Sequence, residues 1–440
     1  MEHVDTLITA RWVIPVEPAD CVLEHHAIAV RQGRIVAIEP EKQALERFSA
    51  TTRIDRPDHV LLPGFVNAHT CAPMTLLRGA AESPSLGHWL TMQIEPLERR
   101  WIDAEYVRDA TELAIADLLT SGTTCFTDMH LFPEVVAQTA SEARIRACVG
   151  LPVLELQTLW AQSPGEYLEK GLRLRDDYRN DPLITTAFAP YTASALTDET
   201  LQRVRRASDE VELPITMRVN ESRSDTAGEG ERTLERLERL GLLSPLFTAI
   251  HMVHLNADDL SRAARGGISV VHCPQSNLKL GNGISPAPAM HALGINLGLG
   301  TAGAAANNDL NLLDEMRTAA LLASGAAPRV DGVAVMSAHD WLRIATLGSA
   351  RALCLADGIG SLVPGKWADL CCIDLARPHS QPVYDVAAAV VHSVSRDQVS
   401  DVWVAGRALV ANGQLMHFDT ADLLRRAERW RERIAPTRQD

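Results

Sequence analysis

Eight short apolar runs, separated by segments of helical periodicity, recur from Val60 to about residue 301 and dominate the sequence. The runs are LLPGFVNAH, TTCFTDM, RACVGLPVL, ITTAFAP, PITMRVN, TAIHMVHL, ISVVHCP and INLGLGT. Intervening segments such as AEYVRDATELAIADLLTSG place apolar residues along one side of a helix. Apolar strands that alternate with amphipathic helices are typical of a parallel sheet covered by helices. The pattern predicts an α/β fold with a (β/α)8 TIM-like barrel over residues 59–355, whose active residues lie where the strands end.

Both ends of the chain have a different pattern, that of short strands broken by turn residues. Residues 1–58 contain two alternating apolar runs on either side of Gln32 and Gly33, which is typical of a hairpin. Residues 356–418 return to short strands punctuated by glycine and proline. We expect these two segments to form one small β-sandwich domain. The last segment, residues 419–440, predicts an exposed C-terminal helix with a solvated arginine face.

Composition narrows the class of partner. The formal net charge of −14 argues against a phosphate backbone as a ligand, so nucleic acid is not expected. No window approaches the roughly 18 apolar residues of a membrane helix, and the first residues do not resemble a secretory signal. The 8 cysteines show no C-x-x-C spacing and mostly lie in apolar runs, which favours reduced core thiols. We expect a soluble, cytoplasmic protein without a membrane partner.

His69 and Cys71 stand two residues apart where the first barrel strand is expected to end. Side chains at this spacing point to the same face of a strand. A histidine and a cysteine that project together indicate a metal site or a reactive thiol. The alternative is that Cys71 is a small core residue in an apolar stretch.

Several longer motifs occur in order along the chain: PGFVNAHTCAPMTLLRG, HMVHL, VVHCPQSNLKLGNG, LGLGTAGAAANNDLNLLDEMRTAAL and GSLVPGKWADLCCIDL. Together they resemble the amidohydrolase superfamily, in the branch of methylthioadenosine, S-adenosylhomocysteine and adenosine deaminases and triazine hydrolases. The resemblance implies a barrel with a small β-sandwich, a homodimer or homotetramer, and one zinc or iron. In the family this metal activates water for attack on a ring carbon that bears the leaving amine.

The metal ligands of the family are only partly present. The first-strand pair of histidines falls on His69 and Cys71, and the fifth-strand histidine falls on Arg218. The eighth-strand aspartate falls on Ala302. Arginine has no lone pair to give to a metal. The resemblance with these replacements predicts that the family zinc has been lost and that the chain has no cofactor.

Other pocket positions follow from the same resemblance. The catalytic glutamate of the family is kept as Glu221, and the sixth-strand histidine that faces the metal-bound water matches His251. We expect catalytic roles for Glu221, His251, Cys71 and Arg218, with Arg218 holding an anionic or carbonyl group. The expected substrate-binding residues are His69, Glu98, Tyr191 and Asn277, of which Glu98 corresponds to a glutamate that holds ribose hydroxyls.

Three hypotheses are open at this point. The first is an enzyme that acts on C–N bonds without a metal and binds a small planar heterocycle or a nucleoside-like compound at the barrel mouth. The second is a catalytically inactive pseudo-deaminase that serves as a binding or oligomer partner. The third is a zinc deaminase with an atypical site made of His69, Cys71 and His251.

Overall fold

The computed structural model describes residues 1–83, 85–226, 230–326 and 336–437. The expected C-terminal helix therefore extends, in its residues 438–440, outside the described part of the chain.

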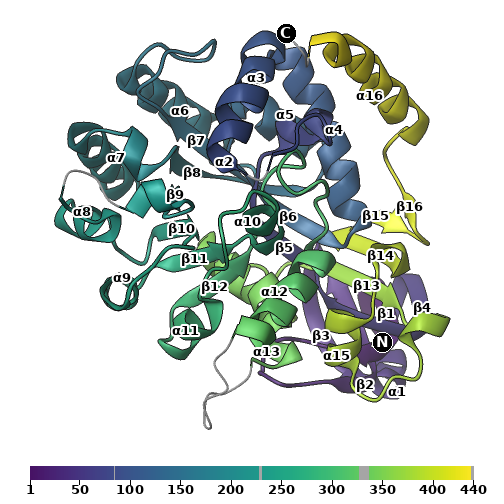
Figure 1. Cartoon of the computed structure of the whole chain (residues 1–440). Coiled ribbons are helices and arrows are strands. Elements are labelled where there is room, and N and C mark those ends of the chain that lie inside the picture. The colour runs from purple at the N-terminus through teal and green to yellow at the C-terminus, as the bar shows by residue number, and fades with distance from the viewer. Residues whose placement is uncertain (84, 227–229, 327–335, 438–440) are drawn as a thin grey trace.

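Eight parallel strands form a nearly closed barrel at the centre of the molecule (Figure 1). They pair in the order of the sequence, and a parallel bridge between Thr70 and Ala302 brings the first and last strand ends together. This confirms the predicted (β/α)8 fold. The strands are β5 (Phe65–Thr70), β6 (Thr123–Asp128), β7 (Arg146–Val153), β8 (Ile184–Pro190), β9 (Ile215–Val219), β10 (Phe247–His251), β11 (Ser269–His272) and β12 (Asn296–Leu299).

Helices surround this barrel on its outside (Figure 1). Their apolar stripes and the strands are buried together, which is why β5, β6 and β7 read as nearly continuous apolar runs. The first large helix starts at the N-cap Asp103, whose carboxylate accepts the N–H of Tyr106. The main barrel helices are α4 (Ala104–Thr120), α5 (Pro133–Ala143), α6 (Pro164–Tyr178), α7 (Asp198–Val211), α8 (Thr233–Arg239), α9 (Ala257–Gly266), α10 (Pro274–Lys279), α11 (Ala287–Ala292) and α12 (Leu312–Ala326).

Strands from the two ends of the chain form a separate sheet beside the barrel (Figure 1). Its members are β1 (Glu2–Val13), β2 (Leu23–Arg31), β3 (Arg34–Pro40), β4 (Phe48–Pro63), β13 (Leu370–Asp374), β14 (Val399–Val404), β15 (Arg407–Ala411) and β16 (Gln414–Leu415). The long strand β4 joins the two halves, because it pairs in parallel with β1 and antiparallel with β13. It runs past the expected domain boundary at residues 58 and 59 and leads into β5 through Gly64.

A buried ion pair links this sheet to the barrel. Arg146 at the start of β7 donates to both carboxylate oxygens of Asp369, at 2.8 and 3.2 Å, and both side chains are almost completely shielded from solvent. Asp369 also accepts the N–H of Ala405 at 2.7 Å. Removing one partner of such a pair leaves an uncompensated buried charge, so the pair fixes how the sheet sits against the barrel.

The C-terminal helix α16 (Thr420–Ile434) lies along α4 in Figure 1 and is docked there by one face. Trp430 is 2% exposed and its indole N–H donates to Asp109 at 2.8 Å. Arg426 forms ion pairs with both Asp109 and Glu112. The expected solvated arginine face is thus only part of the helix, and the other part packs on the barrel.

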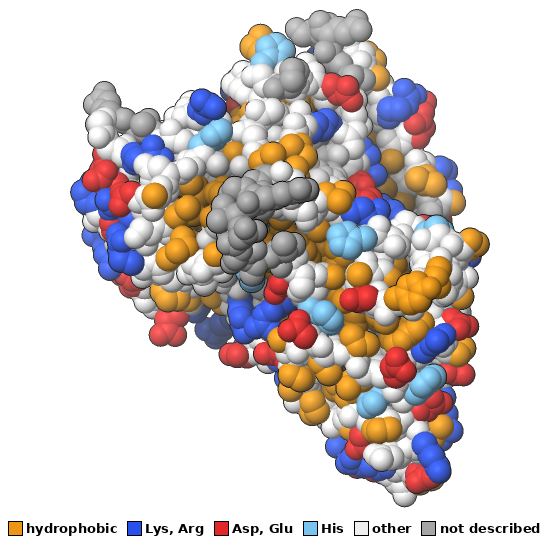
Figure 2. All heavy atoms as spheres, turned by 60° about the horizontal axis from the view of Figure 1, so that its bottom comes forward, with side chains coloured by type: hydrophobic (Ala, Val, Ile, Leu, Met, Phe, Trp, Pro, Cys, Tyr) orange, Lys and Arg blue, Asp and Glu red, His pale blue; other side chains and the backbone are white. Residues whose placement is uncertain are grey.

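None of the helices in the described ranges has both the length and the apolar character needed to cross a membrane. On the face shown in Figure 2, acidic and basic side chains are interspersed rather than gathered by sign.

Candidate active site

A cavity of about 1210 Å³ opens at the carboxyl ends of the barrel strands. Seven of the eight expected site residues line it, namely His69, Cys71, Glu98, Tyr191, Arg218, Glu221 and His251. Asn277 is fully buried and lies outside this lining. The expected residues thus gather at the strand ends, where barrels of this type place their active sites.

Glu221 and His251 form the polar centre of the cavity wall. Glu221 Oε1 lies 3.5 Å from His251 Nε2 and accepts a hydrogen bond from Asn282 Nδ2 at 3.2 Å. The other ring nitrogen of His251, Nδ1, is 2.9 Å from Asn277 Oδ1. Asn277 therefore holds the imidazole of His251 on the side away from Glu221. Burial lowers the pKa of His251, against the opposing effect of the Glu221 charge.

This arrangement suits proton transfer. A neutral histidine carries one ring hydrogen, and when Nδ1 donates it to Asn277 the Nε2 lone pair faces the carboxylate of Glu221. Oε1 of Glu221 and Nε2 of His251 thus lie close enough for a proton to pass between them directly or through one water.

Three strand ends around the cavity carry non-glycine residues with left-handed backbones. The φ angles are +50° at Asn220, +76° at His251 and +56° at Ala302. Such conformations cost about 1–3 kcal/mol each and persist only where the surrounding structure enforces them. The Ala302 N–H donates to the carbonyl of His69 at 3.0 Å. The contact between the first and last strand ends therefore holds the left-handed conformation of Ala302.

Arg218 reaches the cavity from β9 and contacts two of the other expected residues. Its Nη2 donates to the sulfur of Cys71 at 3.4 Å, and its guanidinium lies 5.0 Å from the ring centre of Tyr191. Burial raises the pKa of Cys71 to about 12, although the Arg218 charge acts in the opposite direction. The thiol is therefore protonated near neutral pH, and the condition that a nucleophilic Cys71 requires is not met.

His69 lies across the cavity wall from His251. Their rings meet edge to face with centroids 5.8 Å apart, and His69 Nδ1 is buried without a hydrogen-bond partner. Burial, the Arg218 charge and the neighbouring His251 lower the pKa of His69 well below its usual value. His69 is thus a neutral imidazole near pH 7.

Glu98 pairs with a histidine that the sequence analysis did not single out. Glu98, on α3 (Glu95–Trp101), lies with Oε1 2.9 Å from Nε2 of His130. Burial alone lowers the pKa of His130, but the charge and hydrogen bond of Glu98 outweigh it and the pKa is raised. His130 lies two residues beyond β6, so the rule that active residues follow barrel strands points to it. Asn282, which lies in the motif SNLKLGNG and donates to Glu221, is a second site residue that the sequence analysis did not single out.

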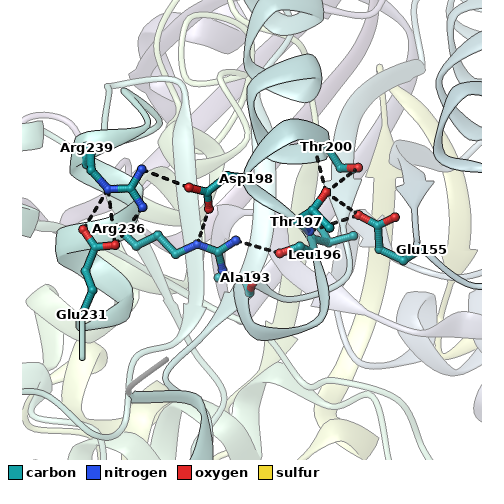
Figure 3. Close-up of polar contacts among 9 residues, drawn as sticks. All are labelled: Glu155, Ala193, Leu196, Thr197, Asp198, Thr200, Glu231, Arg236 and Arg239. Atoms are coloured by element: carbon teal, nitrogen blue, oxygen red, sulfur yellow. Dashed lines mark hydrogen bonds and ion pairs between the residues drawn. The ribbon is translucent and has the colours of Figure 1, made fainter. Parts of the chain in front are cut away.

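A polar network holds the loop that carries Tyr191 against α8 (Figure 3). Arg236 donates to the carbonyls of Ala193 and Leu196 at 2.6 and 2.8 Å and to Asp198 at 2.7 Å. On the other side of this loop, Thr197 donates its backbone N–H and its hydroxyl to Glu155. The loop after β8 is therefore held by Arg236 on one of its sides and by Glu155 on the other.

Similar proteins cover nearly the full length of the chain. A 5-methylthioadenosine/S-adenosylhomocysteine deaminase from Saccharophagus degradans is 39% identical over 438 residues, which is 99% of this chain and 98% of the relative. The corresponding protein from Teredinibacter turnerae is 38% identical over 442 residues, or 99% of each chain.

Solved structures are also similar to this chain over nearly its full length. An adenosine deaminase from Xanthomonas campestris with bound zinc is 43% identical, with a TM-score of 0.96 over 99% of both chains. An atrazine chlorohydrolase from Arthrobacter aurescens complexed with zinc has a TM-score of 0.89 over 97% of this chain and 99% of its own. At 22% identity this second likeness bears on the fold alone.

The prediction that the chain has no cofactor is wrong, because the 43% identical adenosine deaminase structure holds zinc and a metal is expected in such a protein. Whether this chain can hold that metal depends on its own side chains. In the ranges that the structure describes, no three His, Cys, Asp or Glu side chains lie together as a group that could hold a metal ion. His69, Cys71 and His251 line the same cavity as the guanidinium of Arg218, which contacts Cys71 and cannot ligate. As arranged, these side chains do not fit the zinc of the relative.

The model of the amidohydrolase family matches residues 60–409, which include every barrel strand and the first two strands that the C-terminal segment adds to the separate sheet. Together with the full-length relatives, this match shows that the chain belongs to the amidohydrolase family.

Proposed function

We propose that this protein binds a nucleoside-like compound or another small planar heterocycle in the cavity and hydrolyses a C–N bond of it. Family membership supports the coarser part of this proposal, an amidohydrolase or deaminase acting on C–N bonds. The finer part rests on the cavity, because its walls expose more apolar than polar surface, as small-molecule sites do.

The contact between Glu221 and His251 carries the proposal. Hydrolysis forms a bond from a water oxygen to the ring carbon and breaks the bond to nitrogen, while one proton moves from the water to the leaving amine. Glu221 accepts that proton and gives it up again, with His251 as the partner that shares it. Asn282 and Asn277 hold the two side chains in register for this transfer.

Glu98 supports the nucleoside class of ligand. Its carboxylate lines the cavity beside His130, and one oxygen remains to accept hydrogen bonds from a hydroxylated ligand. A ribose with two neighbouring hydroxyls matches such an acceptor.

The experiment measures ammonia release from a panel of adenosine-type nucleosides, the corresponding free bases and amino-substituted triazines. We expect turnover of at least one compound, and loss of the preference for nucleosides over free bases in the Glu98→Gln variant. Absence of turnover across the panel, with ligand binding retained, would support the inactive binding protein instead.

A further inference from the structure

The guanidinium of Arg218 lines the cavity without an acidic partner. Its contacts are the thiol of Cys71 and the ring face of Tyr191, both of which are weak partners for a full positive charge. In the part of the chain that the structure describes, Arg218 makes no ion pair with Asp or Glu. The side chain is half-buried, and a guanidinium that faces a cavity without an ion-pair partner can bind an anion supplied by a ligand.

The two carboxylates of this cavity whose charges act on Arg218 have hydrogen-bond partners elsewhere. Glu221 is held by Asn282 and faces His251, and Glu98 pairs with His130. Neither carboxylate turns to Arg218. The charges of Glu221 and Glu98 still act on Arg218 and raise its pKa, but neither carboxylate forms an ion pair with the guanidinium.

A second observation comes from His69, which lines the cavity beside Cys71 and Ala302. Its side chain is 1% exposed and its Nδ1 atom has no hydrogen-bond partner. A buried polar atom of this kind normally has a partner. A neutral ring therefore lies in the same wall as the guanidinium of Arg218.

The outer part of the cavity carries apolar side chains among charged ones such as Glu155 and Arg223. Leu86, Leu90, Phe132 and Leu154 line it, and Leu156 and Leu159 are 66% and 74% exposed at its mouth. Such a surface suits a flat, weakly hydrated ring. The ligand that fits both parts is an aromatic or heterocyclic ring with one negative group.

We propose that Arg218 binds a carboxylate, or an equivalent planar oxyanion, on a ring compound that occupies the cavity. A guanidinium presents parallel N–H groups that match the two oxygens of a carboxylate. The inference rests on the proposed function in that it uses the same cavity, and it narrows the substrate class to heterocycles with an acidic substituent.

Calorimetric titration of the full-length protein with matched acid and neutral probes tests this. Nicotinate is compared with nicotinamide, and orotate with uracil, because each pair shares a ring and differs in the acidic group. We expect at least one acid to bind about 10- to 100-fold more tightly than its neutral partner, as a charge-assisted hydrogen-bonding pair implies. Arg218→Met removes this difference, and Arg218→Lys retains part of it.

Arg223→Met is the matched control, because Arg223 lines the same cavity but is exposed at its rim. It leaves the preference for acids within about twofold. If Arg218→Met does not fold, as judged by circular dichroism, Arg218→Lys alone carries the comparison.

Two results overturn the inference: equal affinity for acid and neutral probes, or acid binding that survives in Arg218→Met and disappears after chelation, which would assign the carboxylate to a metal. Both are independent of turnover. Ammonia release from neutral nucleosides without acid binding would leave the proposed function standing and remove only this inference. Acid binding that depends on Arg218, in a protein without turnover, would leave this inference standing and remove the proposed function.

Discussion

Nε2 of His251 lies 3.5 Å from Oε1 of Glu221, and the two side chains come from the ends of neighbouring parallel strands. Strand pairing in the barrel therefore sets this distance, since Ile250 and His251 are in register with Arg218 and Val219. A site built on paired strands is held more firmly than one built on loops.

Glu221→Gln is expected to lower kcat by about 10²- to 10⁴-fold, because an amide cannot accept and return the proton. KM should change little, since the amide keeps the shape and one acceptor oxygen. Glu95→Gln is the control, because Glu95 also lines the cavity but makes its ion pair with Arg99. Comparable losses in both variants would contradict the assignment.

Cys71→Ala should retain activity within about tenfold, because a thiol with a pKa of about 12 is not a nucleophile near neutral pH. Alkylation with iodoacetamide at pH 7.5, followed by peptide mass spectrometry, should modify the exposed Cys354 and leave Cys71 unmodified in the folded protein. Rapid labelling of Cys71, or its protection by substrate, would argue for a reactive thiol.

The double variant Arg218→His with Ala302→Asp should bind zinc at least about tenfold more tightly than the unchanged protein. The substitutions exchange a cation for an imidazole ligand and add a carboxylate, both of which bind zinc. Competition with a chromophoric chelator measures the affinity. Arg218→Met alone removes the charge without adding a ligand and separates the two effects. Equal affinities in all three proteins would show that Arg218 does not govern metal binding.

His272 makes stability depend on pH. Burial, with a smaller effect of His251, lowers its pKa from 6.5 to about 4. Between these values the unfolded state binds more protons than the folded state, so stability falls as the pH drops from 6.5 towards 4. The loss attributable to this residue is about 3 kcal/mol.

Urea unfolding at pH 7.0 and 5.0 measures this effect. His272→Gln should lose less stability between the two pH values than the unchanged protein does. The exposed His392→Gln serves as the control and should follow the unchanged protein. Parallel pH profiles for all three proteins would contradict the prediction.

Arg236→Met should lower the free energy of unfolding by about 2 kcal/mol, because it leaves two carbonyls of the Tyr191 loop without their donor. Hydrogen exchange in residues 191–197 should accelerate. Arg239→Met is matched to it, since Arg239 contacts the same Asp198 but is half exposed and donates to carboxylates alone. Its effect should stay below about 1 kcal/mol.

The barrel could be predicted because each strand is buried on both faces and therefore appears in the sequence as an apolar run. The same regularity placed His69, Arg218, Glu221 and His251 around one cavity, since each lies at or just beyond the end of a strand. His130 follows the same rule, since it lies two residues beyond the end of β6.

Other features depend on contacts that no local pattern encodes. Trp430 and Asp109 are 321 residues apart, and only their contact shows that the last helix is docked. The pKa of Cys71 depends on burial, which a sequence reveals poorly for a residue next to a loop. The prediction that the chain has no cofactor rested on the replaced ligand positions alone. It is wrong because a relative with bound zinc is 43% identical to this chain.

The pairing of β4 with β1 and β13 has a consequence for synthesis. When β4 leaves the ribosome, one of its edges can pair with β1, but its other partner ends at Asp374, more than 300 residues later. An open strand edge is a template for wrong pairing between chains. The nascent protein thus carries this edge while the whole barrel is made, and a chain cut short before β13 should aggregate through β4 even when its barrel is complete.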